Sequence, residues 1–188
     1  ADRIETGTYM VAAALTGGDV LLQGASLGDL EALSLKLRAA GVSITAEGQA
    51  VRVSRQGELR AVDTTTSPHP GFPTDMQAQF TALNVVAEGV GRITETIFEN
   101  RLMQAHEMSR MGANITVDGH SVIIRGKSSI DGAPVMASDL RASASLVIAG
   151  LAANGETHVD RIYHIDRGYE RIEEKLQAVG ADIVRKSR

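Results

Sequence analysis

Three aspartates stand where apolar segments of the sequence begin: Asp2, Asp75 and Asp139. An aspartate at the start of a helix accepts hydrogen bonds from free backbone N–H groups, and such an N-cap stabilises the helix by about 1 kcal/mol. A helix start also carries partial positive charge, so several starts at one face attract anions. Capping is the simplest interpretation of each aspartate, and we expect the three starts together to form an anion-binding face.

Four arginines add charge near these expected helix starts. Arg3 and Arg141 follow the first and the third aspartate by one and two residues, so carboxylate and guanidinium groups share a face. Arg101 and Arg167 occupy a second common position, where a strand leads into a helix. A cation at a helix start is disfavoured by the helix dipole, which points to a role in ligand binding. Ion pairs among these groups, or solvated charges, are the alternative interpretation.

Metal and cofactor motifs are missing from the sequence. Cysteine is absent, which excludes disulfides, thiolate metal ligands and a thiol nucleophile within the chain. His106-Glu107 lacks the second histidine that a zinc-binding helix needs four residues later, and Gly89-Val90-Gly91 has Thr94 in place of the third glycine of a dinucleotide motif. We therefore expect neither a metal nor a cofactor.

Charge and hydropathy exclude two classes of partner. The net charge is -4, and no run of Lys and Arg forms a stripe that would follow a nucleic-acid backbone. No apolar run approaches the roughly 20 residues of a membrane-spanning helix. We expect a cytoplasmic protein that binds neither nucleic acid nor membrane.

A phrase of the sequence recurs three times, and each copy ends at or near a glycine. The glycines are Gly41, Gly112 and Gly180, which are 71 and 68 residues apart. A repeat of about 70 residues is the simplest account of this spacing. Each glycine fits the left-handed end of a helix.

Each repeat predicts the same series of elements. An apolar helix that requires full burial is expected at 9–15, 80–87 and 146–153, and a strand follows at 19–23, 92–97 and 156–160. An outer helix comes next, clearest in the stripe Tyr169, Ile172, Leu176 and Val179. The remaining strands are expected at 42–46, 50–54, 60–66, 114–118, 121–125, 134–137 and 181–184. Hairpin turns centred on Gly48 and Gly119 are expected to join 42–46 to 50–54 and 114–118 to 121–125.

These elements predict one α/β domain over residues 1–188, built from three βαβαββ units with pseudo-threefold symmetry. The units cover approximately 1–58, 59–131 and 132–188, with the apolar helices innermost. The first unit lacks its opening strand and the third its last one, so the outer strands are incomplete at both chain ends. An open sheet edge has unpaired backbone groups that can pair with another chain. For this reason, and because the chain starts at Ala1, we expect a longer parent chain to supply the missing strands.

Five phrases of the sequence carry a resemblance to a known family: Asp2-Arg3-Ile4-Glu5-Thr6-Gly7-Thr8, Phe72-Pro73-Thr74-Asp75-Met76-Gln77-Ala78-Gln79, Phe98-Glu99-Asn100-Arg101, Ser138-Asp139-Leu140-Arg141-Ala142-Ser143 and Ile162-Tyr163-His164-Ile165-Asp166-Arg167-Gly168-Tyr169-Glu170. They resemble the UDP-N-acetylglucosamine 1-carboxyvinyltransferases, which are enolpyruvyl transferases, and the likeness covers essentially all 188 residues. It implies transfer of enolpyruvyl from phosphoenolpyruvate to the 3-hydroxyl of UDP-N-acetylglucosamine with release of phosphate, a step of peptidoglycan synthesis.

The resemblance implies catalytic roles for two of the aspartates. Asp75 corresponds to the family aspartate that contacts the sugar 3-hydroxyl and is proposed as its general base. Asp139 corresponds to an aspartate implicated in proton movement at the substrate methylene.

The resemblance also implies substrate-binding residues. Ile97 falls where the family binds the nucleotide sugar through the backbone. Arg101 and Arg167 match arginines that hold phosphoenolpyruvate and close the cleft, Arg141 lines the reaction centre, and Arg3 belongs to the same set.

Family members have two domains, each an inside-out α/β barrel of three such units, and this chain resembles the second domain. The other domain brings the mobile loop with the catalytic cysteine, a phosphoenolpyruvate-binding lysine and much of the uridine contact. We therefore expect the chain alone to be inactive. Two alternatives stay open: a non-catalytic module that binds the nucleotide sugar, and the related 3-phosphoshikimate enolpyruvyl transferase.

Overall fold

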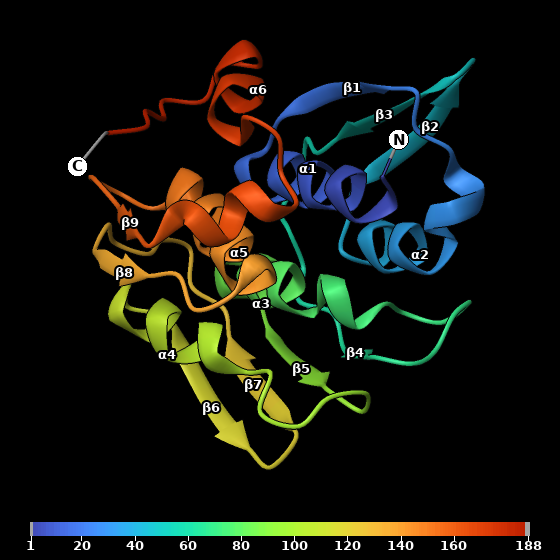
Figure 1. Cartoon of the computed structure of the whole chain (residues 1–188). Coiled ribbons are helices and arrows are strands. Elements are labelled where there is room, and N and C mark those ends of the chain that lie inside the picture. The colour runs from blue at the N-terminus through green and yellow to red at the C-terminus, as the bar shows by residue number, and fades with distance from the viewer. Residues whose placement is uncertain (1, 187–188) are drawn as a thin grey trace.

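The structure, a computed structural model, describes residues 2–186 and shows helices gathered among three separate β-sheets (Figure 1). The first sheet has the strand order β1-β3-β2, and both of its pairs are antiparallel. This part of the chain comprises α1 (Arg3–Thr16), β1 (Asp19–Gln23), η1 (Leu27–Leu30), α2 (Glu31–Ala39), β2 (Ser43–Glu47) and β3 (Ala50–Ser54).

The second sheet repeats this arrangement and adds a strand. Its order is β4-β5-β7-β6, with β4 parallel to β5 and the other pairs antiparallel. The elements are β4 (Thr64–Thr65), η2 (Thr74–Met76), α3 (Gln77–Val86), β5 (Val90–Thr94), α4 (Met103–Arg110), β6 (Asn114–Asp118) and β7 (Ser121–Arg125).

The third sheet consists of one parallel pair, β8 and β9. β4 and β5 also form a parallel pair, so the third sheet corresponds to the β4-β5 edge of the second sheet. This part comprises β8 (Pro134–Met136), α5 (Leu140–Ala152), β9 (His158–Asp160), η3 (Ile162–Arg167) and α6 (Ile172–Ala178).

The helices α1, α3 and α5 pack against one another at the centre of the molecule (Figure 1). Small side chains allow this close approach: every residue from 142 to 149 of α5 is buried, and most are Ala, Ser or Val. The prediction that the apolar helices are innermost is confirmed. Polar side chains are enclosed with them, among them Thr8, Gln79 and Ser143.

The predicted ends of the outer helices and the predicted hairpins are also confirmed. Gly41, Gly112 and Gly180 have φ values of +95°, +85° and +98°, which a side chain would disfavour. Gly48 and Gly119 begin the two-residue turns of the β2-β3 and β6-β7 hairpins, with φ of +62° and +56°.

Some predicted elements are wrong. Residues 181–184 form no strand, because no strand equivalent to β3 or β7 lies beside them in the described part of the chain. The strand predicted at 92–97 is β5 at Val90–Thr94, whose pairing with β7 ends at Ser121, where β7 begins. Val179 is 58% exposed, so the buried stripe of α6 ends at Leu176.

The mixed α/β fold class is confirmed. Within residues 2–186 none of the three sheets closes into a barrel. The strands instead form separate sheets around the central helices α1, α3 and α5. Because these three helices pack together, polar groups at their N-terminal ends can come close to one another.

Candidate functional site

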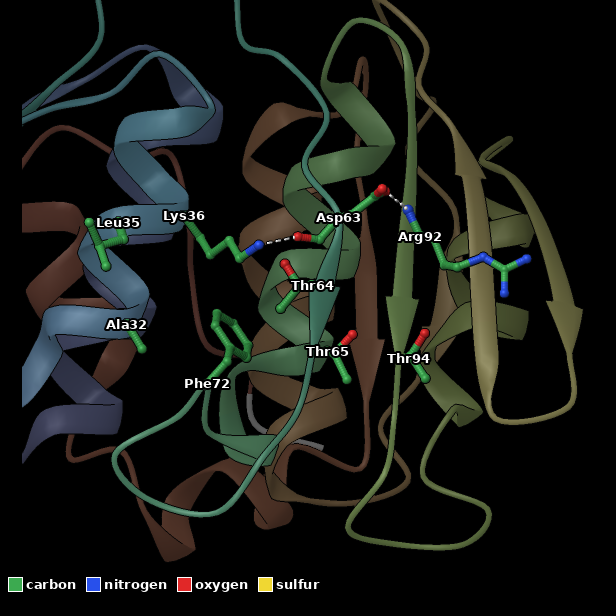
Figure 2. A pocket seen from close by; sticks show the side chains of 9 residues that line it. All are labelled: Ala32, Leu35, Lys36, Asp63, Thr64, Thr65, Phe72, Arg92 and Thr94. Carbon is green, nitrogen blue, oxygen red and sulfur yellow. Dashed lines mark hydrogen bonds between the residues drawn. The ribbon is translucent and has the colours of Figure 1, made fainter.

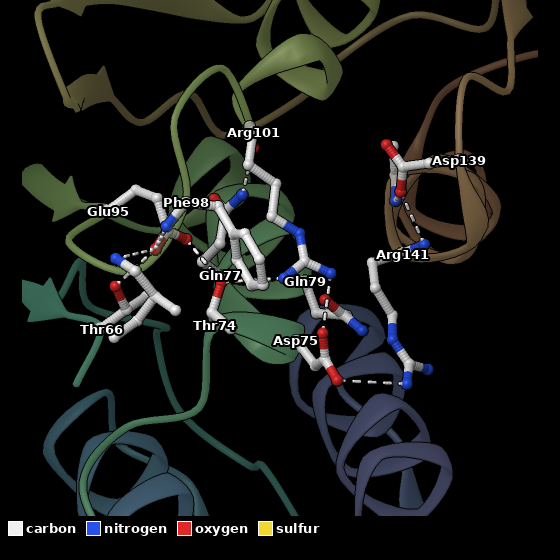
Figure 3. Close-up of polar contacts among 12 residues, drawn as sticks. Thr66, Thr74, Asp75, Gln77, Gln79, Glu95, Phe98, Arg101, Asp139 and Arg141 are labelled. Carbon is white, nitrogen blue, oxygen red and sulfur yellow. Dashed lines mark hydrogen bonds and ion pairs between the residues drawn. The ribbon is translucent and has the colours of Figure 1, made fainter. Parts of the chain in front are cut away.

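Asp75 lies between two arginines from distant parts of the chain (Figure 3). Its Oδ1 accepts a hydrogen bond from Arg101 Nη2 at 2.7 Å, and its Oδ2 lies 3.4 Å from Arg141 Nη2. All three side chains are partly buried, with exposed fractions of 36%, 24% and 18%. Two cations around one carboxylate leave a net positive charge, so this group, called the Asp75 cluster below, suits an anionic ligand.

The three helix-start aspartates do different things. Asp2 caps α1 by accepting from the backbone N–H groups of Ile4 and Glu5, each at 2.8 Å. Asp139 caps α5 in the same way, at 2.9 Å from the N–H groups of its second and third neighbours. The capping interpretation is thus confirmed for these two. It does not hold for Asp75, which lies within η2 and directs its carboxylate to the arginines.

Arg101 is held by several groups besides Asp75. Its Nη1 donates to Thr74 Oγ1 at 3.0 Å, and its guanidinium lies 4.9 Å from the centroid of the Phe98 ring. The preceding residue, Asn100, has a left-handed backbone with φ of +57°, which turns the chain toward the cluster. The guanidinium is therefore fixed before any ligand arrives.

Arg141 leaves the first turn of α5, next to the Asp139 cap. Besides Asp75, its guanidinium meets Tyr169, whose hydroxyl lies 3.4 Å from Nη1 and whose ring centroid lies 5.9 Å from Cζ. Tyr169 is buried and follows η3 in the chain. Asp139 thus positions the backbone of Arg141, while Asp75 and Tyr169 position its side chain.

Glu95 is a buried carboxylate that the sequence analysis missed. It is 2% exposed and accepts from the hydroxyls of Thr66 and Thr74 at 2.8 and 2.7 Å. The backbone N–H groups of residues 97 and 98 also donate to it, at 2.8 and 3.3 Å. The alternation of β5, in which Ile93 faces inward, is the signal that points to a buried position at Glu95.

One of the donors to Glu95, the Thr74 hydroxyl, also positions a member of the Asp75 cluster. Thr74 donates its hydroxyl proton to Glu95 and accepts from Arg101 with the same oxygen. Burial, the largest influence, raises the pKa of Glu95, but four hydrogen bonds together outweigh it and hold the pKa of this carboxyl below its ordinary value.

We expect the Glu95→Gln variant to lose about 1–3 kcal/mol of unfolding free energy, because a buried ionised acceptor of several hydrogen bonds is removed. Since the folded pKa is lowered, the stabilisation is present above the ordinary pKa of about 4.3 and is lost as pH falls through the folded value. Urea unfolding between about pH 3 and pH 7 measures both effects. The matched control is Glu99→Gln, an exposed position in the same loop; an equal loss in both variants would contradict the assignment.

Four predicted site residues lie outside the Asp75 cluster: Asp139, which caps α5, and Arg3, Ile97 and Arg167. Arg3 is exposed, and its Nη1 lies 3.2 Å from His69 Nδ1. The N–H of Ile97 donates to Glu95, which leaves the backbone carbonyl for any contact with a ligand. Arg167 is exposed at the end of η3.

The turn that carries Arg167 is anchored through its neighbour, Asp166. Arg185 binds both oxygens of Asp166 at 2.7 and 3.0 Å and both oxygens of Glu173 at 2.8 and 3.1 Å. Hydrogen bonds from Arg185 hold the pKa values of Asp166 and Glu173 below their ordinary values. Residues near the C-terminus thereby fix η3 to α6.

We expect Arg185→Met to raise the pKa values of Asp166 and Glu173 toward those of free carboxylates. Both folded values are lowered, so the ion pairs stabilise the fold above about pH 4 and stop doing so as pH falls through those values. A carboxyl ¹³C NMR titration reads the two groups directly. Arg171→Met is the control, because Arg171 pairs with Glu174, three residues further along the chain. Unchanged titration of both carboxyls in Arg185→Met would disprove the linkage.

A groove of about 490 Å³ lies between α2 and the β4-β5 edge (Figure 2). Lys36 reaches across it to donate to the carbonyl of Asp63 at 2.6 Å, and the Asp63 carboxylate accepts from the N–H of Arg92 at 2.8 Å. None of its lining residues belongs to the Asp75 cluster. This groove is therefore separate from the candidate site.

Within residues 2–186, no group of three or more His, Asp or Glu side chains is placed to hold a metal ion. The helices of the same region are all too short or too polar to span a bilayer.

Known proteins share this fold and sequence. The chain superposes on the crystal structure of the enolpyruvyl transferase NikO from Streptomyces tendae with a TM-score of 0.86 and 29% identity, over 96% of this chain and 43% of that one. It is 63% identical to the UDP-N-acetylglucosamine 1-carboxyvinyltransferases of Sorangium cellulosum and of Nitratidesulfovibrio vulgaris, in each case over 98% of this chain. It spans 44% of the length of each of these relatives.

The fold is that of the enolpyruvyl transferases, and the Asp75 cluster gives it a site suited to anions. A family model described as EPSP synthase (3-phosphoshikimate 1-carboxyvinyltransferase) matches residues 1–176. The chain belongs to this family. The resemblance stated from the sequence phrases is thereby confirmed.

Proposed function

We propose that the chain is one half of a transferase that moves enolpyruvyl from phosphoenolpyruvate to the 3-hydroxyl of UDP-N-acetylglucosamine and releases phosphate. The observation that carries the proposal is the Asp75 cluster, in which one carboxylate lies between two fixed guanidinium groups. The 63% identity to proteins named for this reaction supports the choice of substrates.

The chemistry of the cluster fits this reaction. The sugar hydroxyl must lose a proton as its oxygen attacks C2 of the enolpyruvyl group, and the Asp75 carboxylate accepts that proton when the hydroxyl is within hydrogen-bond reach. Phosphoenolpyruvate carries a carboxylate and a phosphate, and Arg101 and Arg141 supply bidentate donors for such anions. The same donors stabilise charge that develops in the tetrahedral intermediate.

The remaining residues receive supporting roles in this proposal. Asp139 takes part in proton movement at the substrate methylene and caps the helix that carries Arg141. Arg167 and Arg3, both exposed, bind substrate when the cleft closes, and Ile97 contacts the nucleotide sugar through its backbone. Neither a metal nor a cofactor enters this mechanism.

The proposal includes a partner domain and a repeated architecture. Three units of approximately 1–58, 59–131 and 132–188 make up this domain, and a second domain closes over the Asp75 cluster and completes the site. The enolpyruvyl transfer takes place in the cytoplasm and is a step in the synthesis of peptidoglycan precursors. The similarity of β4-β5 to β8-β9 supports the repeat.

A 3-phosphoshikimate acceptor is the second candidate, because the family model carries the name of that enzyme. The 63% identity to proteins named for the sugar nucleotide favours UDP-N-acetylglucosamine as the acceptor.

The test is an assay of phosphate release from phosphoenolpyruvate and UDP-N-acetylglucosamine. We expect no release by the chain alone and measurable release once the other domain of a close relative is added in trans. Steady turnover by the chain alone would contradict the half-enzyme proposal. If the chain and the added domain together bind UDP-N-acetylglucosamine but release no phosphate, the non-catalytic binding module would be favoured.

A further inference from the structure

We propose that Tyr169, together with Thr8, is a positioning residue that holds Arg141 in the orientation needed to bind substrate. Tyr169 comes from the segment after η3, Thr8 from α1 and Arg141 from α5, so the contact joins three distant parts of the chain. The consequence for catalysis rests on the proposed function, whereas the geometry does not.

The direction of the hydrogen bonds follows from counting protons. Thr8 Oγ1 donates its only proton to the carbonyl of Ile4 at 2.8 Å. In its 2.8 Å contact with the Tyr169 hydroxyl it must therefore act as acceptor, so the phenolic proton points at Thr8. The Tyr169 oxygen then has only lone pairs left, and one of them faces Arg141 Nη1 at 3.4 Å. The tyrosine can accept from the arginine and cannot donate elsewhere.

Burial makes this arrangement hard to replace. Thr8 is 0% exposed and Tyr169 is 1% exposed, so water cannot substitute for either hydroxyl without opening the core. Gln79, also fully buried, donates to Thr8 Oγ1 at 3.1 Å and fills the remaining acceptor position of that oxygen. Gln79 Nε2 also lies 3.5 Å from the Tyr169 hydroxyl, where it faces one lone pair and leaves the other for Arg141.

The effect on Arg141 is to fix its guanidinium from two sides. Asp75 engages Nη2 and Tyr169 engages Nη1, while further N–H groups stay available for a substrate anion. A guanidinium that is already oriented loses less conformational freedom when ligand binds. Tyr169 therefore acts through Arg141 and need not touch the substrate.

A second tyrosine provides the matched control. Tyr9 neighbours Thr8 in the chain and packs against the same apolar cluster as Tyr169, and its buried hydroxyl has no partner among the described residues. Removing the hydroxyl of Tyr9 deletes the same atom from a similar environment without disturbing Arg141.

The first experiment uses the chain without ligand and reads the guanidinium resonances of Arg141 by NMR, assigned by their loss in Arg141→Lys. We expect separate Nη–H signals in the wild type and in Tyr9→Phe, and coalesced or shifted signals in Tyr169→Phe and Thr8→Val. Thr8→Ser, which restores a hydroxyl, should return the wild-type pattern. Unchanged Arg141 signals in Tyr169→Phe would overturn the inference, whatever the activity of the protein.

The second experiment uses the enzyme reconstituted with its other domain. We expect kcat/KM for phosphoenolpyruvate to fall about tenfold in Tyr169→Phe and Thr8→Val, the loss of one hydrogen bond to a charged group, and to be retained in Thr8→Ser and Tyr9→Phe. Equal losses in Tyr169→Phe and Tyr9→Phe would show that packing alone is responsible. Absence of turnover in the wild type would count against the proposed function, and the NMR result would still decide the positioning role.

Discussion

The Asp75→Asn variant, assembled with the other domain, releases phosphate about 10²- to 10⁴-fold more slowly than the wild type, because the group that accepts the proton of the sugar hydroxyl is lost. The substitution preserves size and removes charge. Phosphate release at saturating concentrations of both substrates measures the effect. Asp118→Asn is the control, since Asp118 is an exposed carboxylate 3.9 Å from Arg92 on the outer part of a sheet.

The same variant should bind phosphoenolpyruvate at least as tightly as the wild type. Asp75 occupies donors of both Arg101 and Arg141 in the empty site, so it competes with an incoming anion for them. Its neutralisation raises the net positive charge of the cluster, and we expect affinity to rise a few-fold, within the modest range of partly exposed ion pairs. A variant that loses binding and turnover together would indicate a structural role for Asp75 and contradict its role as a base.

The Arg101→Ala variant is expected to lower kcat/KM for phosphoenolpyruvate about 10²- to 10³-fold, the usual cost of removing one donor that stabilises developing charge. Arg101 makes the shortest contact with Asp75 and is fixed by Thr74 and Phe98, so its loss removes a preorganised cation. Steady-state kinetics with varied phosphoenolpyruvate test this. Arg92→Ala removes an exposed arginine from β5 and should leave the rate unchanged; an equal loss there would point to a general effect of charge.

Repetition made much of the fold predictable. The glycines at the helix ends, the hairpin glycines and the apolar helices each have a local physical cause, so Gly41, Gly48 and Gly112 adopt the expected backbone. The segment 181–184 failed because a strand needs a neighbour, and local pattern does not show whether one is present.

The candidate site was predictable in part. Asp2, Asp75 and Asp139 look alike in the sequence, but two cap helices and the third binds arginines. That difference depends on where Arg101 and Arg141 arrive in space, which is a tertiary property. The polar contacts of Glu95 and Tyr169 were not predicted for the same reason, because Glu95 binds Thr66 from 29 residues away and Tyr169 binds Thr8 from 161 residues away.

The Asp75 cluster is the place where we expect the two substrates to meet. A crystal structure of the assembled two-domain enzyme with UDP-N-acetylglucosamine and an unreactive phosphoenolpyruvate analogue tests this directly. We predict the sugar 3-hydroxyl within about 2.6–3.2 Å of the Asp75 carboxylate and the analogue's anionic groups on Arg101 and Arg141. A sugar bound in the groove between α2 and β4, or a 3-hydroxyl turned away from Asp75, would contradict it.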